Sequence, residues 1–281
     1  MVTVIAIANQ KGGVGKTTTA MNLGAALARA GHRTLLVDAD PQSNATSGLG
    51  LTPKHGFTLY DALAEKISLN TCVLPVRQSN LFIVPATPDL GGAEVELASA
   101  MAREKRLERT LAQIRNDYEY VLIDCSPSLG LLTLNALTAS DAVLIPVQCE
   151  YLALEGLGHL VQTIDRVRTN LNENLNILGV LLTMYDPRTN LSQGVVDQVR
   201  NHFPQTFSTI VPRSVRLSES PSFGQTIFEY AETSSGAKAY SLLADELIER
   251  KSEDRKTCSK TINPTITNRT TTSELAIFGG N

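Results

Sequence analysis

The sequence predicts an α/β protein with a mostly parallel, twisted sheet and helices on both faces. Short runs rich in Val, Ile and Leu alternate with helix-periodic segments along the chain, as in sheets that are covered on both sides. A glycine-rich segment, "NQKGGVGK", joins the first of these runs to the first helical pattern. Hydrophobic residues make up 42% of the 281 residues, which is enough for a sizeable core.

Six apolar runs have the length and composition of buried strands. Near-continuous runs of this kind are typical of parallel strands, because helices cover both of their faces. The predicted strands are residues 2–8, 34–40, 81–87, 120–126, 142–148 and 175–185.

Helix-periodic segments lie between the predicted strands. In residues 18–31, Met21, Leu23 and Leu27 fall near one face, and Gly31 predicts the C-terminal end of the helix. Further helices are predicted over residues 92–116, 152–171, 190–202 and 236–251.

We expect one domain over residues 1–250 and a separate tail over residues 251–281. From Lys251 onward the composition shifts to Thr, Ser and Asn, and the apolar periodicity is lost. Such a composition is typical of a disordered segment. The short apolar run "LAIFG" near its end is too short for an amphipathic membrane helix. A role of the tail in holding a partner or DNA is the alternative interpretation.

Composition excludes several classes of protein. The net charge of −3 and the pI near 5.9 mean that any contact with nucleic acid must come from a local basic patch. No run of about 18 apolar residues predicts a membrane-spanning helix. The cysteines are widely spaced without a CxxC pair, which indicates free thiols in a cytoplasmic protein. They are Cys72, Cys125, Cys149 and Cys258.

The glycine-rich segment has the properties of a phosphate-binding loop. Its glycines allow backbone N–H groups to turn inward, and the following helix N-terminus favours anions. Lys16 is expected to reach the β- and γ-phosphates of a nucleotide, and Thr17 to offer its hydroxyl group to Mg²⁺. The predicted nucleotide-binding residues of the loop are Lys11, Gly12, Gly13, Val14, Gly15, Lys16, Thr17 and Thr18.

The loop departs from the common pattern G-x-x-x-x-G-K-[ST]. Gln10 stands where that pattern has glycine, and a second lysine, Lys11, precedes the turn. The pattern K-G-G-x-G-K-T is the deviant Walker A motif, and with it the chain resembles the ParA/Soj family of partitioning ATPases, in the wider class that includes MinD. The resemblance implies a P-loop NTPase fold. It also implies that Lys16 acts on the nucleotide of its own subunit, whereas Lys11 reaches the nucleotide of the partner across a dimer.

Two carboxylates, Asp38 and Asp40, close the second predicted strand in "LLVDADPQSNAT". Ligands bind at this end of the strands in open α/β sheets. We expect the two side chains to point to opposite sides of the strand, unless the chain has already turned, and to have different roles. The resemblance implies that this stretch is switch I, that Asp40 positions the attacking water, and that Asp38 lies nearer the metal and the loop lysine. In the alternative interpretation, one of them only caps the following turn.

A third carboxylate, Asp124, ends the apolar run "YVLID". An aspartate in this position is typical of a Walker B motif, which holds Mg²⁺ directly or through water. We therefore predict that Thr17, Asp38 and Asp124 hold the metal. The following "CSPSLG" resembles switch II, and Cys125 within it is expected to be a small, half-buried residue rather than a reactive or cluster-ligating thiol.

Two later stretches, "TMYDPRTNLS" and "IVPRSVRLSESPSFGQTIFEY", extend the resemblance over roughly residues 1–250. It implies that Pro212 and Arg213 lie against the nucleotide base. It also implies that Arg188 and Arg216 contact DNA. The alternative for each arginine is an ordinary solvated side chain.

Together these motifs imply an ATP- and Mg²⁺-dependent switch that partitions chromosomal or plasmid DNA. In such a system ATP joins two subunits, the dimer binds DNA without sequence preference, and hydrolysis stimulated by a ParB/Spo0J-like partner releases it. The resemblance thus implies a cytoplasmic, nucleoid-associated homodimer with no membrane partner.

Four other classes of protein fit the sequence less well. A membrane-bound relative of the MinD type would need a basic amphipathic helix at its C-terminus, which "TTTSELAIFGGN" does not offer. A redox protein like the nitrogenase iron protein would need suitably placed cluster cysteines. A ligase or kinase would need a pocket for a small metabolite, for which the sequence offers no candidate. A binding protein that never hydrolyses ATP is disfavoured by Asp40.

Overall fold

The computed structural model describes residues 2–150 and 153–261. The chain divides into two compact units, Met1–Glu246 and Leu247–Asn281. The first unit holds the sheet and most helices. The second unit, in its described part, is the continuation of helix α11, Ser235–Thr261.

The predicted boundary at residue 250 falls inside helix α11. Residues 251–261 are helical, where the sequence analysis expects a disordered tail. Lys, Glu and Arg are good helix formers, so a polar segment rich in them can continue a helix without any apolar periodicity. The remaining part of the predicted tail, residues 262–281, lies outside the described residues.

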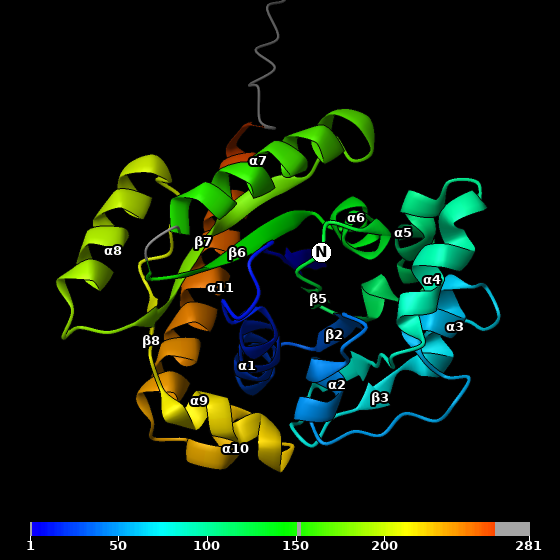
Figure 1. The fold of residues 1–281 in the computed structure, drawn as a ribbon, viewed down its shortest axis with the longest axis horizontal. Helices are drawn as coiled ribbons and strands as arrows, with labels where there is room; N and C mark the ends of the chain where they lie inside the picture. Colours follow the sequence, from blue (N-terminus) through cyan, green and yellow to red (C-terminus); the bar gives the residue numbers. More distant parts are fainter. Residues whose placement is uncertain (1, 151–152, 262–281) are drawn as a thin grey trace, which may run out of the picture. The chain divides into compact units, whose positions relative to one another are not determined.

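Within the described residues, eight strands form one sheet in the order β3-β4-β2-β5-β1-β6-β7-β8 (Figure 1). All neighbouring strands pair in parallel except β3, which is antiparallel to β4, so the predicted mostly parallel sheet is confirmed. The strands are β1 (Thr3–Ile7), β2 (Thr34–Ala39), β3 (Leu74–Pro75), β4 (Leu81–Val84), β5 (Tyr120–Cys125), β6 (Ala142–Gln148), β7 (Asn176–Tyr185) and β8 (Ile210–Pro212).

Strands β3 and β8 are not predicted from the sequence, because their two and three residues are too few to carry a hydrophobic pattern. The α-helices of the described residues are α1 (Lys16–Arg29), α2 (Asn44–Gly48), α3 (Leu59–Leu63), α4 (Leu90–Glu96), α5 (Arg106–Leu111), α6 (Leu131–Thr138), α7 (Ala153–Asn170), α8 (Asn190–His202), α9 (Val215–Glu219), α10 (Ile227–Ala231) and α11. Five short 3₁₀ helices are η1 (Leu69–Cys72), η2 (Leu97–Ser99), η3 (Arg103–Lys105), η4 (Arg115–Asp117) and η5 (Ser220–Phe223).

The helix predicted over residues 92–116 is wrong as a single element. Helices α4 and α5 are separated by the turns η2 and η3, because Ala100 is extended and Ala102 has a left-handed φ of 51°. No Gly or Pro marks this break, so the sequence carries no signal for it.

Helices cover both faces of the sheet in the first unit (Figure 1). Helix α1 packs on β1, β2 and β5, and its Thr19 hydroxyl group lies 3.2 Å from that of Tyr240 in α11. Helices α6 and α7 pack on the opposite face, where Val4 and Ala6 of β1 join the main apolar cluster. Because strand residues alternate in direction, Ile5 and Ile7 face the α1 side.

The strand order places β1 between β5 and β6, at the point where the chain changes direction across the sheet. Ile7, at the end of β1, is in register with Asp124 of β5, which is also in register with Asp38 of β2. The carboxyl ends of three central strands therefore meet beside the N-terminus of α1. This is the place where ligands bind in open α/β sheets.

Candidate nucleotide-binding site

The loop between β1 and α1 is held in place from the neighbouring strands. Asn9 donates from Nδ2 to the backbone oxygen of Pro146 (2.7 Å) and accepts the N–H of Lys11 on Oδ1 (3.0 Å). Thr183 at the end of β7 donates from Oγ1 to the oxygen of Val14 (2.9 Å). Gly15, the N-cap of α1, has a φ of 90°, a left-handed conformation that glycine adopts without strain. The loop is thus a preformed turn at a helix N-terminus, as predicted.

Helix α1 begins at Lys16 and ends where the sequence predicts. Gly31 has a φ of 93°, and the N–H of His32 reaches the oxygen of Leu27 (3.0 Å) while that of Gly31 reaches Ala28 (3.1 Å). These bonds form a Schellman motif, which satisfies the last carbonyl groups of the helix.

Lys16 and Asp124 form the charged centre of the site. The Lys16 side chain is buried, and its Nζ donates to the backbone oxygen of Lys11 (3.2 Å). Burial lowers the pKa of the Lys16 ammonium, while the nearby carboxylates of Asp124 and Asp40 oppose this shift. Burial also raises the pKa of Asp124 well above its ordinary value, assisted by the charge of Asp38. The Lys16 ammonium therefore favours an anionic partner, and the Asp124 carboxylate favours a cationic one, because such a partner would offset the cost of desolvation.

Asp124 fits a bound cation. It is completely buried, and neither carboxylate oxygen has a hydrogen-bond partner among the described residues. The Thr17 side chain faces this carboxylate and lowers its pKa, but the two do not form a hydrogen bond of ordinary geometry. Orphaned carboxylate oxygens next to a hydroxyl group suit a hard cation such as Mg²⁺, which takes few protein ligands and completes its shell with water and phosphate. The described residues contain no cluster of three or more His, Cys, Asp and Glu that could hold a metal by itself.

Asp38 and Asp40 do not diverge, so the expectation that they point to opposite sides is wrong. Both carboxylates raise the pKa of Asp124, and the Asp40 N–H donates to Oδ1 of Asp38 (3.3 Å). Residues two apart in an extended strand share a face, which explains the result. Asp38 Oδ2 accepts hydrogen bonds from the N–H (2.8 Å) and hydroxyl group (2.6 Å) of Thr46 in α2.

The two switch I carboxylates nevertheless differ in their surroundings. Burial raises the pKa of Asp38 to about 6, and the Thr46 hydrogen bonds oppose that rise. The charge of Asp40 acts on the Lys16 ammonium, whereas that of Asp38 acts more strongly than that of Asp40 on Asp124, so the expected position of Asp38 near the metal stays a prediction. One oxygen of Asp40 accepts the N–H of Gln42 (2.9 Å), as a turn-capping residue does. Asp38 thus anchors α2, and Asp40 faces the loop.

A pocket of about 300 Å³ lies over the phosphate-binding loop. It brings the predicted residues Lys16, Thr17 and Thr18 together with Asp40, which lies in another part of the chain. Its full lining is Gly12, Gly13, Gly15, Lys16, Thr17, Thr18, Asp40, Gln42, Asn44, Pro127 and Met184.

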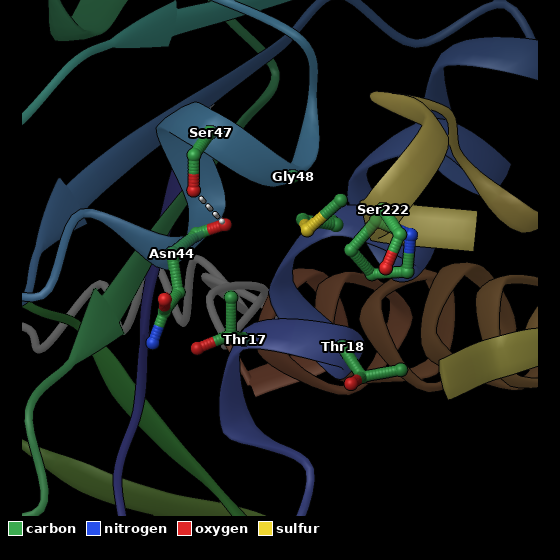
Figure 2. Close-up of a pocket in the computed structure, with 8 residues that line it drawn as sticks. Thr17, Thr18, Asn44, Ser47, Gly48 and Ser222 are labelled. Atoms are coloured by element: carbon green, nitrogen blue, oxygen red, sulfur yellow. Dashed lines mark hydrogen bonds between the residues drawn. The ribbon is translucent and has the colours of Figure 1, made fainter. Parts of the chain in front are cut away.

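A second pocket, of about 350 Å³, adjoins the first through Thr17, Thr18 and Asn44. Figure 2 shows that Asn44 and Ser47 of α2 face Thr17 and Thr18 of α1 across it, with Ser222 at its far side. Its remaining lining residues are Met21, Gly48 and Pro221.

Lys11 lines neither of these two pockets. Its ammonium is 3.8 Å from Oε2 of Glu150, which follows β6, and the two side chains are 41% and 50% exposed. Only its backbone belongs to the inner site, since its oxygen accepts from Lys16 and its N–H donates to Asn9. The two lysines of the loop therefore point to different surroundings.

The segment after Asp124 borders the site as expected of switch II. Pro127 lines the pocket, and the hydroxyl groups of Ser126 and Ser128 lie 2.7 Å apart. Cys125 is buried rather than half-buried, and burial raises the pKa of its thiol. A thiol without thiolate character is a poor nucleophile and metal ligand.

The predicted base-contacting residues are not brought into either pocket. Pro212 is in register with Tyr185 at the end of β7, and the Arg213 N–H donates to the Tyr185 oxygen (2.9 Å). Both residues are thus beside Met184, which lines the first pocket, but neither is among its lining residues. Their contact with a base stays a prediction.

The two predicted DNA-binding arginines are each paired with an acidic residue nearby in the chain. Arg188 donates to both oxygens of Asp186 (2.8 and 2.6 Å), although its side chain is 83% exposed. Arg188 and Arg213 also lower the pKa of Asp186 together. Arg216 lies 3.2 Å from Oε2 of Glu219 and above the ring of Tyr230. Both Arg188 and Arg216 remain open to a solvent-side partner, and their contact with DNA stays a prediction.

Sequence reasoning missed Gln42, Asn44 and Met184 as lining residues and Glu150 as the partner of Lys11. Gln42 and Asn44 stand in the stretch "DPQSN" next to Asp40, so their proximity to the site follows from their position. Met184 and Glu150 are separated from the loop by more than one hundred residues of sequence, and no local pattern marks them.

Comparison with known proteins relates this site to one family. A family model described as an AAA domain matches residues 2–177. The chain is 54% identical to the chromosome partitioning protein ParA of Myxococcus xanthus over 249 residues, which are 88% of each protein. It is 52% identical to the sporulation initiation inhibitor protein Soj of Bacillus subtilis, over 87% of this chain and 97% of the relative.

A solved structure with the same fold is that of cobyrinic acid a,c-diamide synthase from Mycobacterium smegmatis with bound ADP and magnesium. It has a TM-score of 0.80 and 39% identity, over 91% of this chain and 98% of the other.

Among the described helices, none combines the length and the apolar composition that a membrane span requires.

Proposed function

This chain belongs to the ParA/Soj family of chromosome-partitioning ATPases, and from this premise we propose that it is a DNA-partitioning switch driven by Mg²⁺ and ATP. Its fold is that of a P-loop ATPase. In the proposed cycle ATP joins two copies of the chain, the dimer binds DNA without sequence preference, and a ParB/Spo0J-like partner stimulates hydrolysis and release. The protein would act in the cytoplasm, on the nucleoid.

The observation that supports this proposal most directly is the different placement of Lys11 and Lys16. Lys16 is buried beside Asp124, where it can neutralise the phosphates of its own nucleotide. The Lys11 ammonium is half exposed beside Glu150, outside the pocket. A loop already served by one lysine gains little from a second on the same side. A cation on the outside is available to the nucleotide of a partner subunit.

The residues of the pocket account for the proposed hydrolysis. Thr17 and Asp124 would hold Mg²⁺, which supplies charge neutralisation between the phosphates when bound. Asp38 would act on the metal site indirectly, because its oxygens are already engaged by Thr46 and Asp40. Asp40, which faces the loop, would orient the attacking water. No arginine lines the pocket within the described residues, so intrinsic turnover would be slow.

DNA binding would use the exposed arginines near the ends of β7 and β8. The chain has a net charge of −3, so it has no general attraction to DNA. Arg188 and Arg216 supply local positive charge, and a dimer would present two such sets on one assembly. Doubling the number of phosphate contacts strengthens binding and makes it depend more steeply on salt.

One experiment tests the proposal as a whole. ATP hydrolysis is measured with the protein alone, with DNA, and with DNA plus a ParB-like protein from the same source. We expect slow turnover alone and a clear rise with the partner and DNA together. Turnover that is fast alone and insensitive to both additions would contradict the proposed cycle.

A further inference from the structure

The backbone directly after switch I and helix α2 is in contact with a distant segment of the chain. Gly50 follows α2 with a φ of +70°, and Gly224 ends η5 with a φ of +64°. A Cβ atom on Gly224 would lie only 2.7 Å from Cα of Gly50, and one on Gly50 would lie 3.1 Å from the Gly224 oxygen. The two backbones therefore touch with no side chain between them that could absorb a displacement.

A second contact supports the first. Gly48 leaves no room for a larger side chain, since a Cβ atom there would lie 3.0 Å from Sδ of Met21 and 3.3 Å from Cβ of Pro221. Helix α2 is thus wedged between α1 and η5 at its C-terminal end. The pocket shown in Figure 2 extends along the helix from Asn44, which faces Thr17, to Gly48 at its C-terminal end. A displacement of α2 at Asn44 would therefore act on Pro221, which Gly48 approaches, and on Gly224, which Gly50 approaches directly after the helix.

The segment on the far side of this contact holds Arg216. The ring of Phe223, next to Gly224, stacks on that of Tyr230, with centroids 5.0 Å apart and planes inclined by 25°. The Tyr230 hydroxyl group donates to Oε2 of Glu219 (3.0 Å), and Arg216 lies 3.2 Å from the same oxygen. The position of Gly224 therefore bears on the position of Arg216 through two rings and one carboxylate.

The near end of the contact lies in the nucleotide site. Asp40, Gln42 and Asn44 line the pocket over the phosphate-binding loop, and Asn44 is the first residue of α2. Asp38, buried beside Asp124, holds α2 through Thr46. A ligand that occupies the pocket would act on α2 at both places.

We propose that the backbone contact between Gly50 and Gly224 couples the state of switch I to the position of Arg216. The two glycines are positioning residues: neither touches the nucleotide pocket, and each is required to be small. This inference rests on the proposed function for the role of Arg216, but the coupling itself is defined without DNA. Coupling of this kind is a free energy shared by two sites, so it must act in both directions.

The test compares Gly224→Ala with the control Gly56→Ala. Gly56 also has a left-handed φ, +83°, but nothing lies within 4 Å of a Cβ atom placed there. Both variants place alanine at a left-handed φ, and only Gly224→Ala also disturbs the contact. Gly50→Ala, whose Cβ atom meets Gly224 less closely, serves as the second contact variant in case Gly224→Ala does not fold.

The first readout is amide hydrogen exchange of residues 215–224 with and without a non-hydrolysable ATP analogue. In the wild-type protein and Gly56→Ala, the analogue should change the exchange of this segment. In the contact variants that change should be lost, while affinity for the analogue stays within about threefold of wild type. A contact variant that keeps the full wild-type exchange response would overturn the proposal.

The second readout is DNA affinity in the ATP and ADP states. The ratio of the two affinities should fall about tenfold in the contact variants and stay unchanged in Gly56→Ala. An unchanged ratio in a folded contact variant would likewise overturn the coupling. If the wild-type protein binds no DNA in either state, the proposed function fails, and the exchange readout still decides the coupling.

Discussion

The Nζ atom of Lys16 donates a hydrogen bond to the backbone oxygen of Lys11, 3.2 Å away, so the side chain of one loop lysine is bonded to the backbone of the other. The Lys16 side chain folds back across the turn, whereas the Lys11 side chain extends outward to Glu150. This division assigns a separate role to each ammonium group, and replacing each one should have a separate effect.

Lys16→Ala should weaken ATP binding by about 100-fold or more, because the phosphates lose the one lysine or arginine that is buried among the described residues. Lys11→Ala should bind ATP with near wild-type affinity but lose dimer formation and hydrolysis. Nucleotide affinity is measured by calorimetry, and dimer formation by sedimentation with a non-hydrolysable analogue.

The matched control for both lysines is Lys54→Ala, an exposed lysine outside the pocket, which should change neither quantity. A Lys11→Ala protein that still dimerises with wild-type affinity would refute the role of Lys11 across the dimer.

Asp124→Asn should stabilise the protein at pH 8 in the absence of Mg²⁺. Burial raises the pKa of Asp124, so the native state holds a proton at a pH where the unfolded chain has released it. The stability contributed by this carboxyl group is therefore present below about pH 4, its unfolded range, and lost as the pH rises through its native pKa. Asparagine avoids that loss, and we expect a gain on the order of 2 kcal/mol in the free energy of unfolding.

Urea unfolding in EDTA between pH 4 and pH 8 checks this expectation, and the gain should shrink towards pH 4. The pKa of Asp38 is raised to about 6, so this group also makes the native state less stable as the pH rises, in the wild-type protein and in the Asp124 variant alike. The control is Asp61→Asn: Asp61 accepts from the N–H (3.1 Å) and hydroxyl group (2.7 Å) of Thr58, and its loss should destabilise by about 1 kcal/mol. If Asp124→Asn is less stable than wild type at pH 8, the carboxylate is not strained by burial.

Asp40→Ala should bind ATP and dimerise but lower kcat by about 100-fold or more, because a positioned group that handles the attacking water contributes a factor of this size. Asp40 is suited to this role because it lines the pocket, whereas both oxygens of Asp38 are already hydrogen-bonded. Single-turnover phosphate release separates this effect from binding. Asp89→Ala, at an exposed position, is the control. Unchanged single-turnover rates in Asp40→Ala would remove Asp40 from the mechanism.

Arg188→Ala and Arg216→Ala should weaken DNA binding equally for unrelated sequences and leave ATP-driven dimerisation intact. Each lost phosphate contact should lower the slope of log affinity against log salt by about 0.9 on duplex DNA. Binding in the wild-type protein should require ATP. Titrations of two unrelated DNA sequences at several salt concentrations measure both quantities.

The ion pair with Asp186 offers an opposite change. Asp186→Asn removes the carboxylate that holds Arg188, so it should strengthen DNA binding, while the exposed Arg109→Ala should have no effect. Weaker binding by Asp186→Asn, or unchanged binding by the Arg188/Arg216 double variant, would count against a DNA-contacting role.

The sequence by itself determined the central sheet and the loop. The runs that form β1, β2, β5 and β6 are nearly continuous in apolar residues, which is the pattern that strands buried on both faces require. The phosphate-binding turn and the left-handed Gly31 that terminates α1 depend on local backbone geometry, which glycine placement encodes directly, whereas α1 begins at Lys16, two residues before the predicted start.

Only the tertiary structure decided what lies against that loop. The pairing of Lys11 with Glu150, the lining of the pocket by Met184 and the contact of Gly50 with Gly224 each join segments that are far apart in the chain. No local pattern encodes such contacts, because they depend on strand order and on how the connecting segments pack. The relative direction of the Asp38 and Asp40 side chains follows from strand periodicity, which is a local property of the sequence. The hydrogen bonds from Thr46 to Asp38, in contrast, depend on the packing of α2 beside β2.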